Sequence, residues 1–147
     1  MADLLSTADR EFFQDILGDL FDTFKRTILI HKEPIKKIIN PALDVYAGYA
    51  EDSTQNNIEY IHQNREFEAL VSHLGRSNAS FDSEINVQVP KNASVRIKLK
   101  SDARDYIMKG KTERLEIDGN SYNIIGNESL RYNFGFKLYV FYLEQTK

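Results

Sequence analysis

The chain has 147 residues, of which 41% are hydrophobic and 28% charged, and its formal net charge at pH 7 is −3. The absence of cysteine excludes disulfides and thiolate metal sites, and the acidic balance excludes nucleic-acid binding through a general basic field. No apolar run approaches the roughly 20 residues of a membrane helix, so we expect no membrane partner. The length is typical of one domain, and we predict a single domain over residues 1–147.

The first segment predicts an amphipathic helix over about residues 6–24. Ser6 or Thr7 can cap its first turn. Its apolar residues recur at helical spacing in two adjacent rows. The rows are Phe12, Ile16 and Leu20, and Phe13, Leu17, Phe21 and Phe24.

After the helix the hydrophobic period becomes that of strands, which predicts a β domain over about residues 26–144. Residues 27–32 form a β-branched run, and residues 43–49 alternate apolar with small or polar side chains. Pro34 and Pro41 are expected to bracket the connection between these two strands. Residues 58–62 alternate as a strand does, whereas residues 63–74 leave strand and helix open.

The second half predicts further strands. Residues 75–83 are typical of an exposed loop, and residues 85–89 and 95–99 alternate. One short helix is expected over residues 101–108, with Ser101 or Asp102 as its cap.

A hairpin is predicted between residues 113–117 and 122–125. Placing Gly119-Asn120 in the turn pairs Ile117 with Tyr122, whereas Asp118-Gly119 would pair Ile117 with Asn120. Cross-strand apolar pairs stabilise a sheet, so we predict the Gly119-Asn120 turn.

Residues 132–143 predict a long last strand that is apolar on both faces along its second half. Such a strand must be covered on both sides, by the helix, a second sheet or another subunit. Tyr side chains are also enriched in protein interfaces. The candidate interface residues are Phe12, Phe13, Phe21, Tyr139, Phe141 and Leu143.

A basic row formed by Arg96, Lys98 and Lys100 alternates with the apolar residues of one strand. We interpret it first as a solvated outer face. The alternative is a contact with an acidic protein or with DNA passing nearby.

No pattern indicates catalysis. His62 and Glu66 would share a face on a helix but lack further ligands, and no phosphate-binding glycine loop occurs. Asp102 and Asp105 are interpreted as capping or solvated charges. We therefore predict no enzyme, no cofactor and no metal.

The predicted fold is mainly β, a small antiparallel barrel or sandwich with an N-terminal amphipathic helix and one short internal helix. Residues 97–107 and 115–125 resemble the C-terminal half of small head–tail connector proteins of tailed bacteriophages, closest to the head-closure or stopper type. The shared pattern is hydrophobic-x-hydrophobic-Asp-Gly-x-x-Tyr-x-hydrophobic, which starts at Leu115. Residues 24–32 resemble the first strand of that family.

The resemblance implies a virion structural protein of the phage neck, assembled in the host cytoplasm. Copies would form a homo-oligomeric ring that contacts portal or adaptor and tail proteins. The ring would help retain packaged DNA, which would pass through its channel without sequence-specific binding. The alternatives are a tail-completion or terminator subunit and a cytosolic β-barrel that binds a ligand or peptide.

Overall fold

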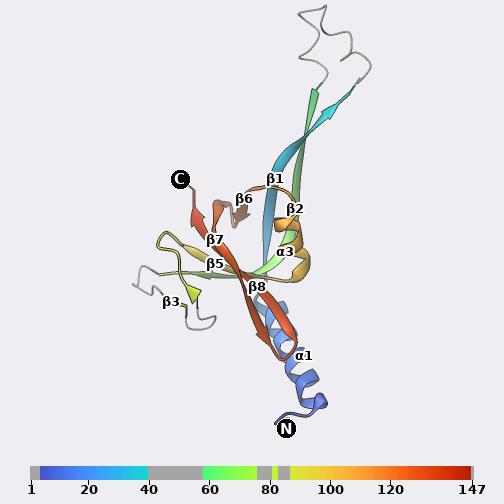
Figure 1. The fold of residues 1–147 in the computed structure, drawn as a ribbon, viewed down its shortest axis with the longest axis vertical. Helices are drawn as coiled ribbons and strands as arrows, with labels where there is room; N and C mark the ends of the chain where they lie inside the picture. The colour runs from blue at the N-terminus through green and yellow to red at the C-terminus, as the bar shows by residue number, and fades with distance from the viewer. Residues whose placement is uncertain (1–3, 40–57, 76–80, 83–86, 147) are drawn as a thin grey trace, which may run out of the picture.

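A computed structural model describes residues 4–39, 58–75, 81–82 and 87–146. Two helices and eight strands are present in this part of the chain. The predicted mainly β class is confirmed (Figure 1). The elements are α1 (Thr7–Phe24), β1 (Arg26–Ile38), β2 (Ile58–His73), β3 (Phe81–Asp82), β4 (Val87–Gln88), β5 (Val95–Leu99), α3 (Ser101–Met108), β6 (Thr112–Ile117), β7 (Asn120–Asn133) and β8 (Phe136–Gln145).

Six of the strands form a closed barrel in the order β1-β2-β5-β8-β7-β6, with every neighbouring pair antiparallel. The barrel closes between β1 and β6, where Ile28 lies opposite Ile117 and Ile30 opposite Leu115. Strands β3 and β4 pair separately. The sequence left barrel and sandwich open, and the closing pair decides for the barrel.

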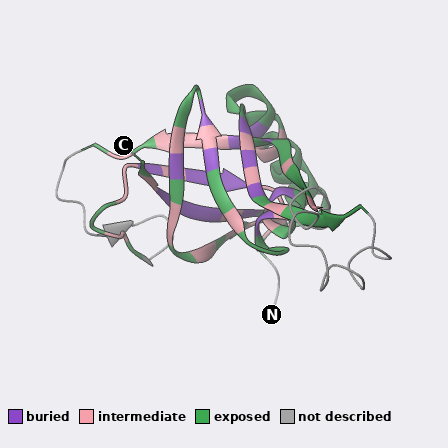
Figure 2. Cartoon of the chain, turned by 90° about the horizontal axis from the view of Figure 1, so that it is seen from above, coloured by how far each residue is buried: buried purple, intermediate pink, exposed green. Residues whose placement is uncertain are grey.

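Buried residues recur at alternate positions of the barrel strands, as the purple bands in Figure 2 show. Their side chains form the core of the barrel. Helix α3 adds Ala103 and Ile107 to the same core. An interior packed with side chains is usual for small barrels. The core strand residues are Ile28, Ile30, Phe67, Ala69, Val95, Ile97, Leu99, Leu115, Ile117, Tyr122, Phe141 and Leu143.

Strand β2 resolves the segment whose period was ambiguous. It continues through His73, pairing first with β1 and then with β5. Phe67 and Ala69 are buried and Val71 packs against the core, which is a strand period. Their pairing with two neighbouring strands outweighs the helix-like spacing of the sequence.

Strand β1 is longer than predicted, because it runs on through Pro34 to Ile38. Pro34 was expected in a connection. It lies instead at a register shift between Lys32 and Ile35, one of the few strand positions that tolerate a missing N–H. Pro41 and the strand predicted at 43–49 fall outside the described residues, as do most of the loop predicted at 75–83 and the start of the strand predicted at 85–89.

The two helices begin differently. Ser6 caps α1 in a capping box, in which the Ser6 hydroxyl accepts from the Asp9 N–H and the Asp9 carboxylate accepts from the Ser6 N–H. Helix α3 begins after Lys100, without a side-chain cap. The prediction of Ser101 or Asp102 as the cap of α3 was wrong, since the strand ends one residue earlier than that cap requires.

The predicted register of the β6–β7 hairpin was wrong. Leu115 lies opposite Tyr122 and Ile117 opposite Asn120, which leaves Asp118 and Gly119 as the turn. Both turn residues have positive φ, 49° and 81°. These values are those of a type I′ turn, which matches the twist of the flanking strands. In this register Ile124 has no apolar partner on β6, but it lies opposite Leu143 on β8 and so gains an apolar partner there.

The predicted long last strand is divided by a hairpin. Strand β7 ends at Asn133, Phe134 and Gly135 form the turn, and β8 begins at Phe136. Phe134 and Gly135 have φ of 50° and 91°. Apolar alternation continues across this turn, which is why the sequence concealed it.

Candidate interaction surfaces

Helix α1 is held against the β7–β8 hairpin by one of its two apolar rows. Phe21 is fully buried and meets the Phe136 ring edge-on at 6.5 Å. Phe13 stacks on Phe134 at 4.8 Å between ring centroids. Phe13 and Phe21 of this row therefore contact the hairpin, and Phe21 is not available to a partner, whereas Phe24 at the end of the row is exposed.

The other row faces solvent. Phe12, Ile16 and Leu20 are 63%, 43% and 49% exposed, and we call these three residues the helix patch. Asp15 and Asp19 lie three residues after Phe12 and Ile16, so they border the patch along one side of the helix. Exposed apolar surface of this kind is typical of an interaction site.

Strand β8 does not supply the expected interface. Phe141 and Leu143 are buried in the barrel core, and Tyr139 packs against that core. On the outer face of the same strand, Val140 and Tyr142 are also buried. Both faces of β8 are thus covered by the chain itself, and the expectation that a partner covers Tyr139, Phe141 and Leu143 is corrected.

The predicted basic row accounts for part of the burial of Val140 and Tyr142 on the outer face of β8. Lys98 lies opposite Val140 and Arg96 opposite Tyr142. Lys98 is only 8% exposed and Arg96 is half-buried. Long basic side chains of this kind cover apolar neighbours with their aliphatic stems.

The third member, Lys100, places its ammonium 4.5 Å from the centre of the Phe21 ring and 4.0 Å from an Asp22 carboxylate oxygen. It therefore helps to seat α1. The interpretation of the row as a solvated outer face was wrong for Lys98, which is buried, and for Arg96, which is half-buried, whereas Lys100 remains 43% exposed.

A feature that the sequence did not reveal is a two-stranded arm. The β1–β6 ladder ends at Lys32, and apart from the Glu33 N–H, which donates to the Lys111 carbonyl oxygen at 3.2 Å, β1 then pairs with β2 alone. Strand β2 pairs with β1 alone until Ala69. We call residues 33–38 and 58–63 the arm, which projects from the barrel at the end opposite α1 (Figure 1).

The arm exposes apolar side chains on both of its faces. One face carries Ile35 opposite Ile61, which are 51% and 42% exposed. The other carries Tyr60, 60% exposed, opposite Lys36. An isolated two-stranded ribbon is only marginally stable in water, so this surface is expected to be covered in the working protein.

Lys32 anchors the base of the arm. Its buried ammonium donates to the carbonyl oxygens of Ile107 and Lys109, at 3.0 and 2.5 Å, and lies 5.0 Å from the centre of the Tyr106 ring. These carbonyls belong to the C-terminal turn of α3, where a cation is favoured. Burial lowers the pKa of Lys32.

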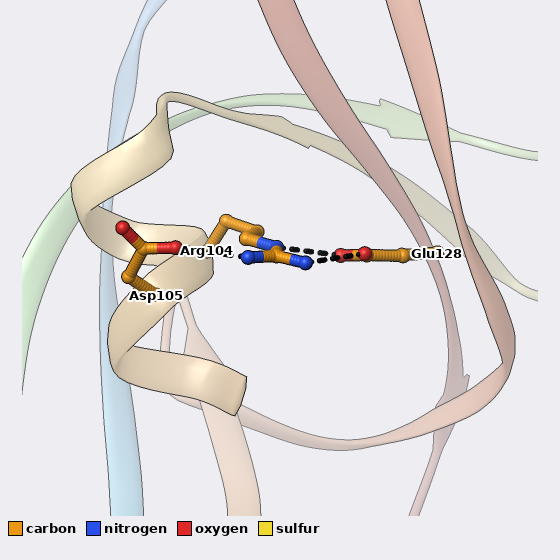
Figure 3. Close-up of polar contacts among 3 residues, drawn as sticks. All are labelled: Arg104, Asp105 and Glu128. Atoms are coloured by element: carbon orange, nitrogen blue, oxygen red, sulfur yellow. Dashed lines mark hydrogen bonds and ion pairs between the residues drawn. The ribbon is translucent and has the colours of Figure 1, made fainter. Parts of the chain in front are cut away.

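Arg104 joins α3 to β7. Its guanidinium donates to both carboxylate oxygens of Glu128, at 2.9 and 2.7 Å, and to Asp105 at 3.0 Å (Figure 3). These hydrogen bonds lower the pKa of Glu128 and raise the pKa of Arg104. Asp105 is thus an ion-pair partner, and Glu128 fixes β7 beside the register shift that follows Ile125.

The histidines do not form a metal site in the described part of the chain, where no cluster of three or more candidate ligands occurs. His62 and Glu66 lie on a strand, four residues or about 13 Å apart along it, so they do not converge. His31 is 3.2 Å from Glu116, in a pair across β1 and β6.

Comparison of the chain with protein-family models, with curated proteins and with solved structures gave no match. Neither described helix has the length and apolar character needed to cross a membrane. The fold and its exposed surfaces therefore supply the functional argument.

Proposed function

We propose that this protein is a virion structural protein of the neck of tailed bacteriophages. It forms a homo-oligomeric ring between portal and tail, helps to retain packaged DNA and provides a surface on which the tail docks. DNA passes through the channel without sequence-specific binding.

One observation carries this proposal: apolar side chains are exposed on two elements that project from opposite ends of a filled barrel, namely α1 and the arm. A ring is made from heterologous contacts, in which one surface of a subunit meets a different surface of the next. A subunit with two distinct apolar surfaces has what such a contact needs.

The filled barrel supports assembly over the alternative of a ligand-binding module. Ile28, Ile97 and Leu115 are among the fully buried side chains that occupy the interior. A barrel that holds a small ligand instead keeps a cavity at its centre.

The experiment is light scattering after size exclusion, with electron microscopy of the same fractions. The chain is studied alone and with the portal protein encoded in the same genome. Rings with a central channel that form on the portal support the proposal, and a free ring that binds only tail protein favours a tail terminator. A chain that stays monomeric with both proteins overturns a role in the neck.

A further inference from the structure

We infer that the helix patch of one copy docks on the Lys36–Tyr60 face of the arm of the next copy. This contact rests on the proposed ring, and it names the two surfaces that the ring brings together. The inference follows from the placement, the apolar character and the charge of the two surfaces.

The placement excludes a contact within one chain. Helix α1 and the arm lie at opposite ends of the molecule, with the barrel between them (Figure 1). A contact between them therefore joins two copies head to tail. Such a contact leaves one helix and one arm unpaired at the ends of any open chain, and ring closure satisfies both.

The helix patch is long enough to cover the apolar residues on this face of the arm. The helix patch spans nine residues from Phe12 to Leu20, which are eight residue steps or about 12 Å along a helix. On one face of the arm, Tyr60 lies directly across from Lys36, and Ile38 lies two residues further along β1; Tyr60 and Ile38 are both exposed. Two residues of a strand cover about 7 Å, so the patch can lie across this face and beyond it.

The charges are complementary. Asp15 and Asp19 border the helix patch, and among the described residues neither carboxylate has an ion-pair partner. Lys36 lies across from Tyr60 and two residues before Ile38 on the same face of the arm, and it likewise has no ion-pair partner in the described part of the chain. An acidic border on one surface and a cation on the other favour the docked pair and oppose helix-to-helix association.

The two faces of the arm differ in charge, which selects the docking face. On the opposite face Lys37 is the cross-strand partner of Glu59, so opposite charges lie next to each other there. On the Lys36 face no carboxylate lies across the ribbon, because the residue opposite Lys36 is Tyr60. The acidic helix is therefore expected to choose the Lys36 face.

A charge-exchange experiment tests the contact. We expect Asp15→Lys with Asp19→Lys in one variant, and Lys36→Glu in another, each to weaken self-association roughly tenfold or more. Mixing the two variants restores rings, because each acidic surface then meets a basic one on the other variant. Lys37→Glu is the matched control on the opposite face and is expected to assemble as the unmodified chain does.

Cross-linking gives an independent readout, since the chain has no cysteine of its own. A chain carrying Ile16→Cys and Tyr60→Cys, treated with a short bis-maleimide, is expected to give a ladder of covalent oligomers. Each single-cysteine variant is expected to stay monomeric. Dimers from Ile16→Cys alone would show helix-to-helix pairing and overturn the inference.

The outcomes separate this inference from the proposed function. Rings that assemble without helix-to-arm cross-links, or that tolerate Lys36→Glu, overturn the inference but remain compatible with the proposed function in the neck. Cross-links that run only to the portal or tail protein likewise overturn it. Helix-to-arm rings that bind neither portal nor tail overturn the neck function and retain the contact, and the absence of any self-association overturns both.

Discussion

Phe13 of α1 stacks on Phe134, the first residue of the β7–β8 turn, whose φ is 50°. A bulky residue in the left-handed region is rare and is retained only where its surroundings hold it there. The helix provides two such restraints, the Phe13 ring and the Gln14 amide, which donates to the Phe134 carbonyl oxygen at 2.5 Å. Helix and turn are therefore expected to lose stability together.

Phe13→Ala should lower the free energy of unfolding by about 1–2 kcal/mol, because it removes the stacked pair and part of the buried area. Urea denaturation of the dilute monomer measures this loss. Phe24→Ala removes an equally large but exposed ring at the end of the same helix. It should stay within about 0.5 kcal/mol of the unmodified chain, and an equal loss in both variants would contradict a specific role for the stack.

Gly135→Ala should destabilise the chain more than Gly119→Ala does. Both glycines have positive φ, 91° and 81°, so both substitutions carry backbone strain of about 1 kcal/mol. Only at Gly135 would the added Cβ collide with a neighbour, the Gln14 amide nitrogen.

Denaturation of the two alanine variants, each also in a Gln14→Ala background, separates strain from collision. Gln14→Ala should remove most of the excess cost of Gly135→Ala and should not change the cost of Gly119→Ala. An excess that persists without the Gln14 side chain would mean that α1 does not press on this turn.

Glu128→Gln should lower the melting temperature by a few degrees Celsius at pH 7 and by much less at low pH. The folded-state pKa of Glu128 is lowered by Arg104 from an ordinary value of 4.5. The ion pair therefore contributes stability above about pH 4.5, and this contribution is lost as the pH falls through the lowered folded value.

Thermal melts of both proteins between pH 7 and pH 3 test this dependence. The two melting temperatures should approach each other toward the acidic end, because protonation of the glutamate progressively removes the ion pair with Arg104. Glu113→Gln, which removes an exposed carboxylate on β6, is the control and should show no such convergence. A constant difference for Glu128→Gln at all pH values would assign its effect to packing.

Lys32→Met should lower the free energy of unfolding by about 1–3 kcal/mol, since it removes the side-chain donor to the Lys109 carbonyl and one of two side-chain donors to the Ile107 carbonyl, which keeps the Thr112 hydroxyl. Lys36→Met, at an exposed position on the same strand, should be nearly neutral in the monomer. Hydrogen exchange should also show faster opening of the α3 C-terminus in the Lys32 variant alone. Equal stability of the two methionine variants would show that Lys32 is solvated.

The elements that the sequence predicted well are those whose pattern depends on local chemistry. The α1 helix has a serine cap and two apolar rows, and the strand at residues 95–99 alternates strictly. The β6–β7 register was missed because cross-strand apolar pairing was weighed above the backbone geometry of the turn. Asp118 and Gly119 both adopt positive φ, and Ile124 finds its apolar partner on another strand.

The surface predictions depended on which side of each element the rest of the chain covers. The two helix rows look alike in sequence, yet only the Phe13 row meets the β7–β8 hairpin. The Arg96–Lys98–Lys100 row looks solvated, yet it covers Val140, Tyr142 and Phe21. The arm could not be predicted from the residues of β1 and β2. It exists because no third strand pairs beside them there, and their local sequence pattern does not show this.

The continuity of β1 and β2 has a mechanical consequence. Each strand passes from the arm into the barrel wall as one element, and the two are paired along most of that length. A pull on the arm along its axis loads many interstrand bonds in parallel, in shear, whereas a sideways pull would break them in succession. A neighbouring copy that binds the arm can thus transmit tension directly to the barrel of this subunit.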